Sequence, residues 1–382
     1  MSRRVSVPVR FLTAGLLAAT ALAGCVPPAA VVDDANIGVD PKDFPSLRVG
    51  GEPNDTFAEP VDVIFDDQGS ARLQGTIASS ADVDIYALGP MTAGDRIIID
   101  VGTPSGLDAA VAVFDEAGRL AFENDDRNLD VGLLDPFLNA VIRRDSSVYF
   151  LAIAAAPLGE PGRRVGAYEI LLQVARGGVP PATAGQLFLL DFDGGTIDIP
   201  GDRVYTVGAF NAGDIAREYA GQTSAVRQQV LATVLENYEG LELDVRMVPG
   251  DALPPAGTFS RVLFGGRNPS AFGISQSVDP YNADPADGSI VFTDMFTPAR
   301  FGRVLTPREL GIAIGNVATH EMGHILGLNH VADIFDLMDT TGGPSTLLID
   351  QEFLSSPLDE SIFPLGVQDS LLLLLETLGP AR

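Results

Sequence analysis

The sequence is short of several residue types on which whole classes of protein depend. Its 382 residues include three histidines, one cysteine and no tryptophan, and 51 aspartates and glutamates outnumber 24 lysines and arginines. A single cysteine excludes an intramolecular disulfide. The formal net charge of −27 argues against nucleic acid as a partner, because a basic surface is needed to replace phosphate counterions. The acidic excess has three explanations: solubility, a salty habitat or calcium sites.

The first 24 residues have the layout of a secretory signal peptide. MSRRVSVPVR supplies three arginines, and FLTAGLLAATALAG is apolar but too short for a comfortable transmembrane helix. Cys25 follows at once, and residues 22–25 (LAGC) resemble the lipobox of bacterial lipoproteins. The resemblance implies that Cys25 is lipidated and becomes the first mature residue. An ordinary signal peptide with a nearby cysteine is the alternative.

A lipid on Cys25 would hold the protein on a membrane without spanning it. Val26 stands where an aspartate commonly retains lipoproteins at the inner membrane. We therefore expect an exported bacterial lipoprotein at the outer membrane, the cell surface or in the periplasm.

Composition divides the rest of the chain into two domains joined by short linkers. Residues 25–48 are rich in Pro, Ala and Asp and predict a tether, and residues 177–185 form a Gly/Pro-rich linker. Residues 49–176 contain many short alternating segments, including ARLQGTI, DRIIIDV and AYEILLQVA, which favour an antiparallel β-sandwich. This segment resembles the bacterial pre-peptidase C-terminal domain in GEPNDTFAEP (51–60), DVDIYAL (82–88), residues 112–126 and GAYEILLQV (166–174).

Oxygen-bearing side chains in the first domain suggest a calcium site. Glu52, Asn54, Asp55 and Asp84 are donors of the kind that calcium prefers. Polar turn residues without an ion are the alternative.

Residues 186–382 predict an α+β domain with a twisted mixed sheet. QLFLLDFDGG (186–195), LDVRMV (243–248), SRVLFGG (260–266) and GSIVFTDMF (288–296) are typical of strands. Residues 224–241 have helical apolar spacing, and LLLLLE (371–376) predicts a core-facing helix near the C-terminus.

All three histidines lie within ATHEMGHILGLNH (318–330). Thr306, Pro307 and Glu309 predict a capped helix start, so His320 and His324 stand one turn apart on one helix face. Gly327 allows the chain to leave the helix and bring back His330. Three neutral imidazoles with an open fourth position describe a catalytic zinc site, with Glu321 placed as general base.

The motif HExxHxxGxxH is the metzincin signature. Met338 resembles the methionine of the Met-turn beneath the zinc in these peptidases, and the short loop before it is similar to the matrixin branch. The resemblance implies that residues 187–195 form the opening strand, residues 288–296 the substrate-binding edge strand, and FPLGVQDSLLLLLETLG (363–379) the final helix.

The chain also departs from the matrixin pattern. Val331 replaces a small hydroxyl residue, and Thr340 replaces the tyrosine with which some metzincins stabilise the oxyanion, so that role is unassigned. No histidine remains for a structural zinc, and no free cysteine for a cysteine-switch prodomain. Loop oxygens that suggest a second calcium site, or simply solvated carboxylates, belong to Asp279, Asn282, Asp284, Asp287 and Asp294.

These observations predict a lipid-anchored zinc metalloendopeptidase with one catalytic zinc and a protein or peptide substrate. A catalytically inactive metzincin-fold binding or adhesion lipoprotein is the second hypothesis, and Glu321 speaks against it because a structural metal site does not need that carboxylate. A zinc hydrolase acting on a non-peptide amide is the third. Residues 340–345 and the final helix are expected to shape the specificity pocket.

Overall fold

The computed structural model describes residues 48–128, 132–200 and 202–382. The signal peptide predicted for residues 1–24, the lipidation site Cys25 and the tether as far as residue 47 lie outside this part of the chain. Within it, no helix combines the length and the apolar character that crossing a membrane requires.

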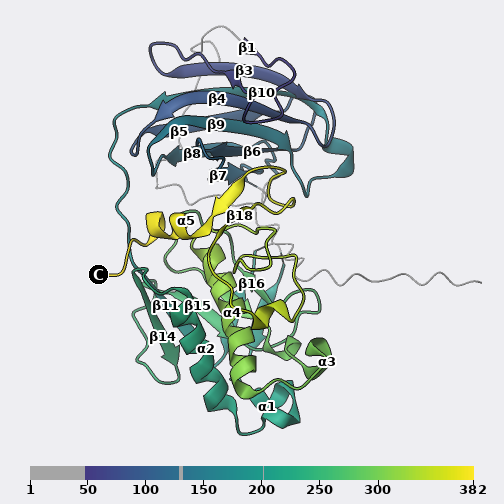
Figure 1. Ribbon diagram of the computed structural model, residues 1–382, viewed down its shortest axis with the longest axis vertical. Helices are drawn as coiled ribbons and strands as arrows, with labels where there is room; N and C mark the ends of the chain where they lie inside the picture. Colours follow the sequence, from purple (N-terminus) through teal and green to yellow (C-terminus); the bar gives the residue numbers. More distant parts are fainter. Residues whose placement is uncertain (1–47, 129–131, 201) are drawn as a thin grey trace, which may run out of the picture.

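Two five-stranded sheets stack face to face in the N-terminal part of the protein (Figure 1). In spatial order, one sheet contains β1 (Arg48–Val49), β3 (Ser70–Ile77), β10 (Gly166–Ala175), β5 (Arg96–Gly102) and β8 (Phe137–Val141). The other contains β2 (Val61–Asp62), β4 (Val83–Met91), β9 (Ser146–Ala155), β6 (Ala109–Phe114) and β7 (Leu120–Asn124). Neighbouring strands are antiparallel, except that β1 runs parallel to β3 and β2 to β4.

The second of these sheets is covered on both faces. Along β5, in the first sheet, Ile97 and Ile99 are buried and alternate with partly exposed residues, as expected for a strand with one apolar face. Every residue of β6 is buried instead. Val113 contributes to the core between the sheets, whereas Phe114 contributes to a separate core on the outer face. A third layer must therefore lie against β6.

The C-terminal part is built on another five-stranded sheet. Its spatial order is β14 (Leu243–Val248), β11 (Gln186–Asp191), β15 (Ser260–Phe264), β17 (Gly288–Val291) and β16 (Gly273–Ser275). The strands are parallel except β16, which runs antiparallel to β17. Helices α2 (Thr223–Asn237) and α4 (Pro307–Ile325) pack against each other and share one large core with the sheet.

Shorter elements surround this sheet. They are the hairpin β12 (Gly195–Asp198) and β13 (Val204–Val207), the pair β18 (Ser355–Pro357) and β19 (Val367–Asp369), and helices α1 (Ala212–Ile215), α3 (Pro298–Phe301) and α5 (Ser370–Thr377). Single 3-10 turns occur at η3 (Pro161–Arg163), η4 (Arg217–Tyr219), η5 (Thr293–Met295) and η6 (Thr346–Leu348).

The prediction that residues 288–296 form the edge strand is wrong. β17 ends at Val291, continues into the 3-10 turn η5, and lies between β15 and β16. The edge strand is β16, which has only three residues and therefore shows no alternation that a pattern could detect. The final helix is also shorter than expected: residues 367–369 pair as β19, and Asp369 Oδ1 accepts from Leu372 N at 3.1 Å to begin α5 at Ser370.

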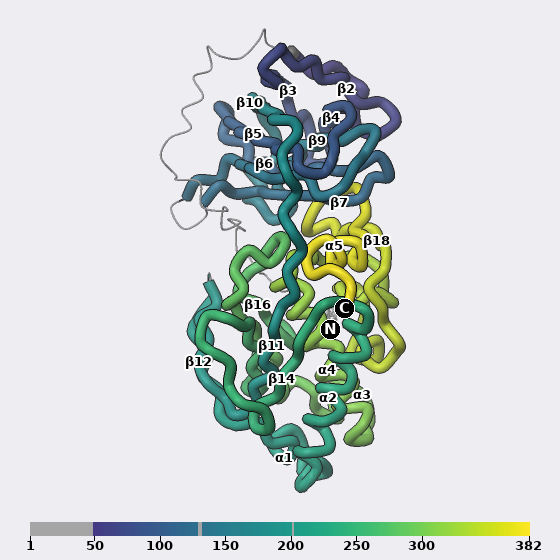
Figure 2. The backbone as a smooth tube through the Cα atoms, turned by 90° about the vertical axis from the view of Figure 1, so that its left-hand side faces the viewer, coloured from purple at the N-terminus to yellow at the C-terminus, as the bar shows by residue number. Residues whose placement is uncertain are grey.

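The C-terminal segment is the third layer that covers β6. Figures 1 and 2 show β18 and α5, in yellow, between the two parts of the protein. Leu358 and Phe363 share a buried core with the outer face of the β2-β4-β9-β6-β7 sheet. Arg144 contacts Glu376 across this boundary at 2.9 Å. The two parts consequently share apolar surface and charge pairs, in addition to the extended connection between β10 and β11.

Candidate metal centre

Helix α4 begins and ends where local side chains complete its hydrogen bonds. At the start, Thr306 Oγ1 accepts from Glu309 N at 3.2 Å while Glu309 Oε2 accepts from Thr306 N at 2.8 Å, which confirms the predicted capping box. At the end, Gly327 has φ +93°. Its N–H donates to His324 O and that of Leu328 donates to Gly323 O, both at 2.9 Å, as in a Schellman motif.

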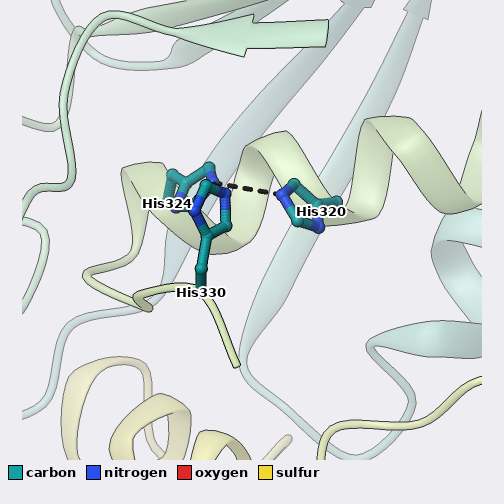
Figure 3. Close-up of side chains that lie close together, drawn as sticks. All are labelled: His320, His324 and His330. Carbon is teal, nitrogen blue, oxygen red and sulfur yellow. Dashed lines mark hydrogen bonds between the residues drawn. The ribbon is translucent and has the colours of Figure 1, made fainter. Parts of the chain in front are cut away.

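This helix end brings the three imidazoles together. His320 and His324 project from α4, and His330 reaches them from the loop that follows (Figure 3). His324 Nε2 lies 3.1 Å from His320 Nε2 and 3.0 Å from His330 Nε2. The Nδ1 atoms of His320 and His324 lie 2.7 Å from Leu337 O and 2.8 Å from Leu328 O. Because those carbonyls only accept, the Nδ1 atoms carry the protons and the Nε2 lone pairs face the centre.

The donor set fits a zinc ion. Tetrahedral bonds of about 2.0–2.1 Å place two ligand nitrogens about 3.3 Å apart, close to the separations found here. Burial lowers the pKa of all three imidazoles, that of His330 to about 3, so they are neutral and ready to bind a metal. Buried lone pairs that face each other with no proton between them repel, and a cation removes this repulsion.

Met338 packs against α4 at Gly323, the residue before His324. It is fully buried in a turn in which Asp339 N donates to Asp336 O at 3.1 Å. A Cβ atom added to Gly323 would lie only 2.6 Å from Met338 Sδ. Gly323, which precedes His324, therefore allows the thioether to approach the helix closely. The sequence gives no signal for the role of Gly323, because only the folded chain brings Met338 to it.

Glu321 lies between α4 and the edge strand β16. It is 2% exposed, and its Oε2 accepts from the hydroxyl of Ser275 at 2.8 Å. Burial raises the pKa of Glu321 to about 8, and the Ser275 hydrogen bond opposes the rise. A divalent cation at the imidazoles would favour the ionised carboxylate. Ser275 has no signal in the sequence, because only the folding of the sheet brings it to the helix.

Val331 and Thr340, which depart from the matrixin pattern, hold the loop between His330 and Met338. Val331 N donates to Met338 O at 3.1 Å. Thr340 Oγ1 donates to Asp359 Oδ2 at 2.8 Å. The Asp359 N–H donates in turn to His330 O at 3.1 Å, so the segment that covers the N-terminal sheets also supports the third histidine.

The predicted calcium ligands of the first domain are only partly gathered. Ligand oxygens of Glu52, Asp84 and Asp82 lie within 4.8 Å of one another, although Asp82 was not among the predicted residues. Asn54 is buried beside them and Asp55 is exposed. Burial, followed by repulsion between the carboxylates, raises the pKa of Glu52. Calcium binding here stays a prediction.

The loop carboxylates of the second domain separate into two places. Burial first, and then Asp279 and Asp284, raise the pKa of Asp287 to about 8, so these three act on one another. Asn282 lies in the same loop and donates to Gln186 Oε1 at 3.1 Å. Asp294 belongs to η5, and its charge interacts with Asp214 instead. The five residues therefore do not form one site.

Comparison with known proteins gives only distant similarities. No protein-family model and no curated protein matches the chain. The pre-peptidase C-terminal domain of a Bacillus anthracis collagenase is 17% identical over 32% of this chain and 99% of its own, with TM-score 0.23. Archaemetzincin from Methanopyrus kandleri is 16% identical over 52% of this chain and 98% of its own, with TM-score 0.26. A zinc-dependent peptidase from Methanocorpusculum labreanum is 13% identical over 49% of this chain and 99% of its own, with TM-score 0.26.

Proposed function

We propose that this protein is a zinc-dependent metalloendopeptidase with Glu321 as its general base. The observation that carries the proposal is that three buried imidazole Nε2 atoms converge on one point. Glu321, the residue after the first of these histidines, has a buried carboxylate that contacts the edge strand β16. A closed structural zinc site uses four protein ligands, whereas three histidines leave one position for a reactant. The contact of Met338 with Gly323 on the histidine-bearing helix supports a metzincin of the matrixin-like kind.

The edge strand β16 offers the main-chain groups that would hold a peptide. Phe272 O accepts from Phe292 N at 2.7 Å, and Gln276 N donates to Gly288 O at 2.9 Å. Main-chain groups alternate in direction along a strand, so those of Gly273 and Ser275 point away from β17. No other strand of the described residues pairs with β16. An extended peptide can therefore add to this edge and pass alongside Glu321.

The chemistry follows from the same residues. A zinc ion held by His320, His324 and His330 would lower the pKa of a water molecule and polarise the carbonyl to be attacked. Glu321 takes a proton from the attacking water and later delivers it to the leaving amine. The low exposure of the carboxylate and the imidazoles keeps bulk water from competing for these groups.

We propose in addition that Cys25 is lipidated and that the enzyme is exported to the bacterial outer membrane or cell surface. The support is the sequence LAGC (22–25) after a short apolar run. Radiolabelled fatty acid should enter the wild-type protein in cells and should not enter Cys25→Ser. Label in both proteins, or in neither, would contradict lipidation at this residue.

The peptidase proposal is tested by measuring zinc and cleavage on the same purified preparations. Wild type should contain about one zinc per chain and cleave casein or members of a peptide library. Glu321→Ala should keep the metal and lose cleavage, whereas His324→Ala should lose both. Zinc in the wild type with no cleavage of any peptide would overturn the proposal and favour an inactive binding lipoprotein. Full cleavage by Glu321→Ala would refute the assigned base.

A further inference from the structure

We infer that Ser275 is a positioning residue for Glu321, holding the carboxylate beside β16 through a hydrogen bond to Oε2. This inference rests on the proposed peptidase function and adds a residue that fixes the orientation of the general base. It comes from the contacts between β16 and α4, which belong to separate segments of the chain.

Both acceptors within hydrogen-bond distance of the Ser275 hydroxyl belong to Glu321. Ser275 Oγ lies 2.8 Å from Glu321 Oε2 and 2.8 Å from the main-chain oxygen of the same residue. Ser275 is 4% exposed, so water does not readily replace either contact. A hydroxyl has one proton to donate. A charged acceptor binds that proton more strongly than a neutral one, so the ionised carboxylate holds it and the main-chain oxygen is the second acceptor.

The two oxygens of the carboxylate have different surroundings. Oε2 is occupied by the Ser275 hydroxyl. Oε1 lies against Gly273, where an added Cβ atom would collide with it. Gly273 and Ser275 are two residues apart on β16, so both turn the same face toward α4. The absence of a side chain at Gly273 therefore lets the carboxylate lie against the strand, and Ser275 holds it there.

The proton transfer can be written with these atoms. The water oxygen bonds to the peptide carbonyl carbon as the π pair of the C=O bond moves onto the carbonyl oxygen, and the water O–H bond breaks as its proton passes to the Glu321 carboxylate. The carbonyl double bond then re-forms as the C–N bond breaks, and the carboxyl group of Glu321 delivers the proton to the leaving amine nitrogen. Ser275 keeps its own proton throughout. When Glu321 is neutral, the hydroxyl can turn from Oε2 to the main-chain oxygen at the same distance.

The test compares Ser275→Ala with Ser289→Ala. Ser289 is the cross-strand partner of Ser275, is equally buried, and has no hydrogen bond from its hydroxyl to Glu321. Zinc content, kcat and KM for a cleaved peptide, and crystal structures of the zinc-bound proteins are measured for both variants and for wild type. For Ser275→Ala we expect kcat to fall about tenfold to a hundredfold at unchanged KM and zinc content, because one charge-assisted hydrogen bond is lost. Its Glu321 carboxylate should leave Gly273, while Ser289→Ala should match wild type in every measurement.

Three results would overturn the inference. They are a kcat within about threefold of wild type for Ser275→Ala, a raised KM with unchanged kcat, or an equal loss of kcat in Ser289→Ala. Absence of cleavage by wild type would instead refute the peptidase proposal. The crystal structures then decide alone: a carboxylate in its original position in Ser275→Ala would refute the positioning role.

Discussion

Replacing Phe363 by alanine tests whether the C-terminal segment joins the two parts of the protein into one cooperative structure. Phe363 is 1% exposed, and its ring centroid lies 5.8 Å from that of Phe114 on β6. Truncating a buried phenylalanine removes its transfer free energy and leaves a cavity, which together cost about 3–5 kcal/mol. We expect a loss of this size in the free energy of unfolding.

The assay is urea unfolding followed by far-ultraviolet circular dichroism, with a metal chelator present. The chelator is needed because a bound ion stabilises the folded state according to its concentration and would mask part of the loss. Phe335→Ala is the matched control, since Phe335 is 56% exposed and its removal should change stability by no more than about 0.5 kcal/mol. A cost below about 1 kcal/mol for Phe363→Ala would refute the reasoning.

The same variant should weaken the metal centre. Phe363 N donates to Asp359 O at 3.3 Å, and Asp359 N donates to His330 O at 3.1 Å, so a loosened turn reaches the third histidine in two steps. We expect zinc affinity, measured by competition with a chelating dye, to fall by up to about tenfold. Unchanged affinity together with the full loss of stability would show that the turn holds its shape without the ring.

Two further predictions concern a glycine next to a histidine of the site and a buried carboxyl group elsewhere in the second domain. Gly323→Ala should lower the melting temperature in chelator, with a net cost of about 1–2 kcal/mol, because the new Cβ would lie 2.6 Å from Met338 Sδ. Gly343→Ala is the control and should leave the melting temperature unchanged, because no atom lies within 4 Å of its Cβ. Asp287 keeps its proton up to a pKa of about 8 in the folded protein but loses it near pH 4 when unfolded, so stability should fall as the pH rises between these values. Asp287→Asn should remove this contribution to the pH dependence of stability. The variant should therefore gain stability relative to wild type from pH 5 to pH 9, measured as the difference between their urea midpoints in chelator. Unchanged melting of Gly323→Ala, or a pH-independent difference for Asp287→Asn, would contradict these expectations.

Local sequence was sufficient for the elements whose signals lie within one segment. The start of α4 follows from Thr306 and Glu309, and its end from Gly327, because capping and left-handed backbone involve neighbours along the chain. The spacing of His320 and His324 placed both imidazoles on one face for the same reason. Longer strands such as β3 and β10 were also recognised by their alternation.

Local sequence patterns do not predict very short strands or the layers that cover a sheet. β16 has three residues and shows no alternation, so the sequence predicts the edge strand at residues 288–296, although β17 lies inside the sheet. The apolar residues of β6 indicated a strand but not the layer that covers its outer face. That layer comes from residues 358–363, far along the chain, and no local pattern encodes such a pairing.

By itself, the sequence determined the donors of the candidate metal site, because histidine spacing on a helix and a glycine at its end are local properties of the chain. Tertiary structure alone decided what surrounds them. It brought Ser275 to Glu321, Met338 to Gly323, and the Asp359 N–H to the carbonyl of His330. Each of these contacts joins segments separated by a sheet crossing or a long loop, and only the packing of the whole core fixes their distance.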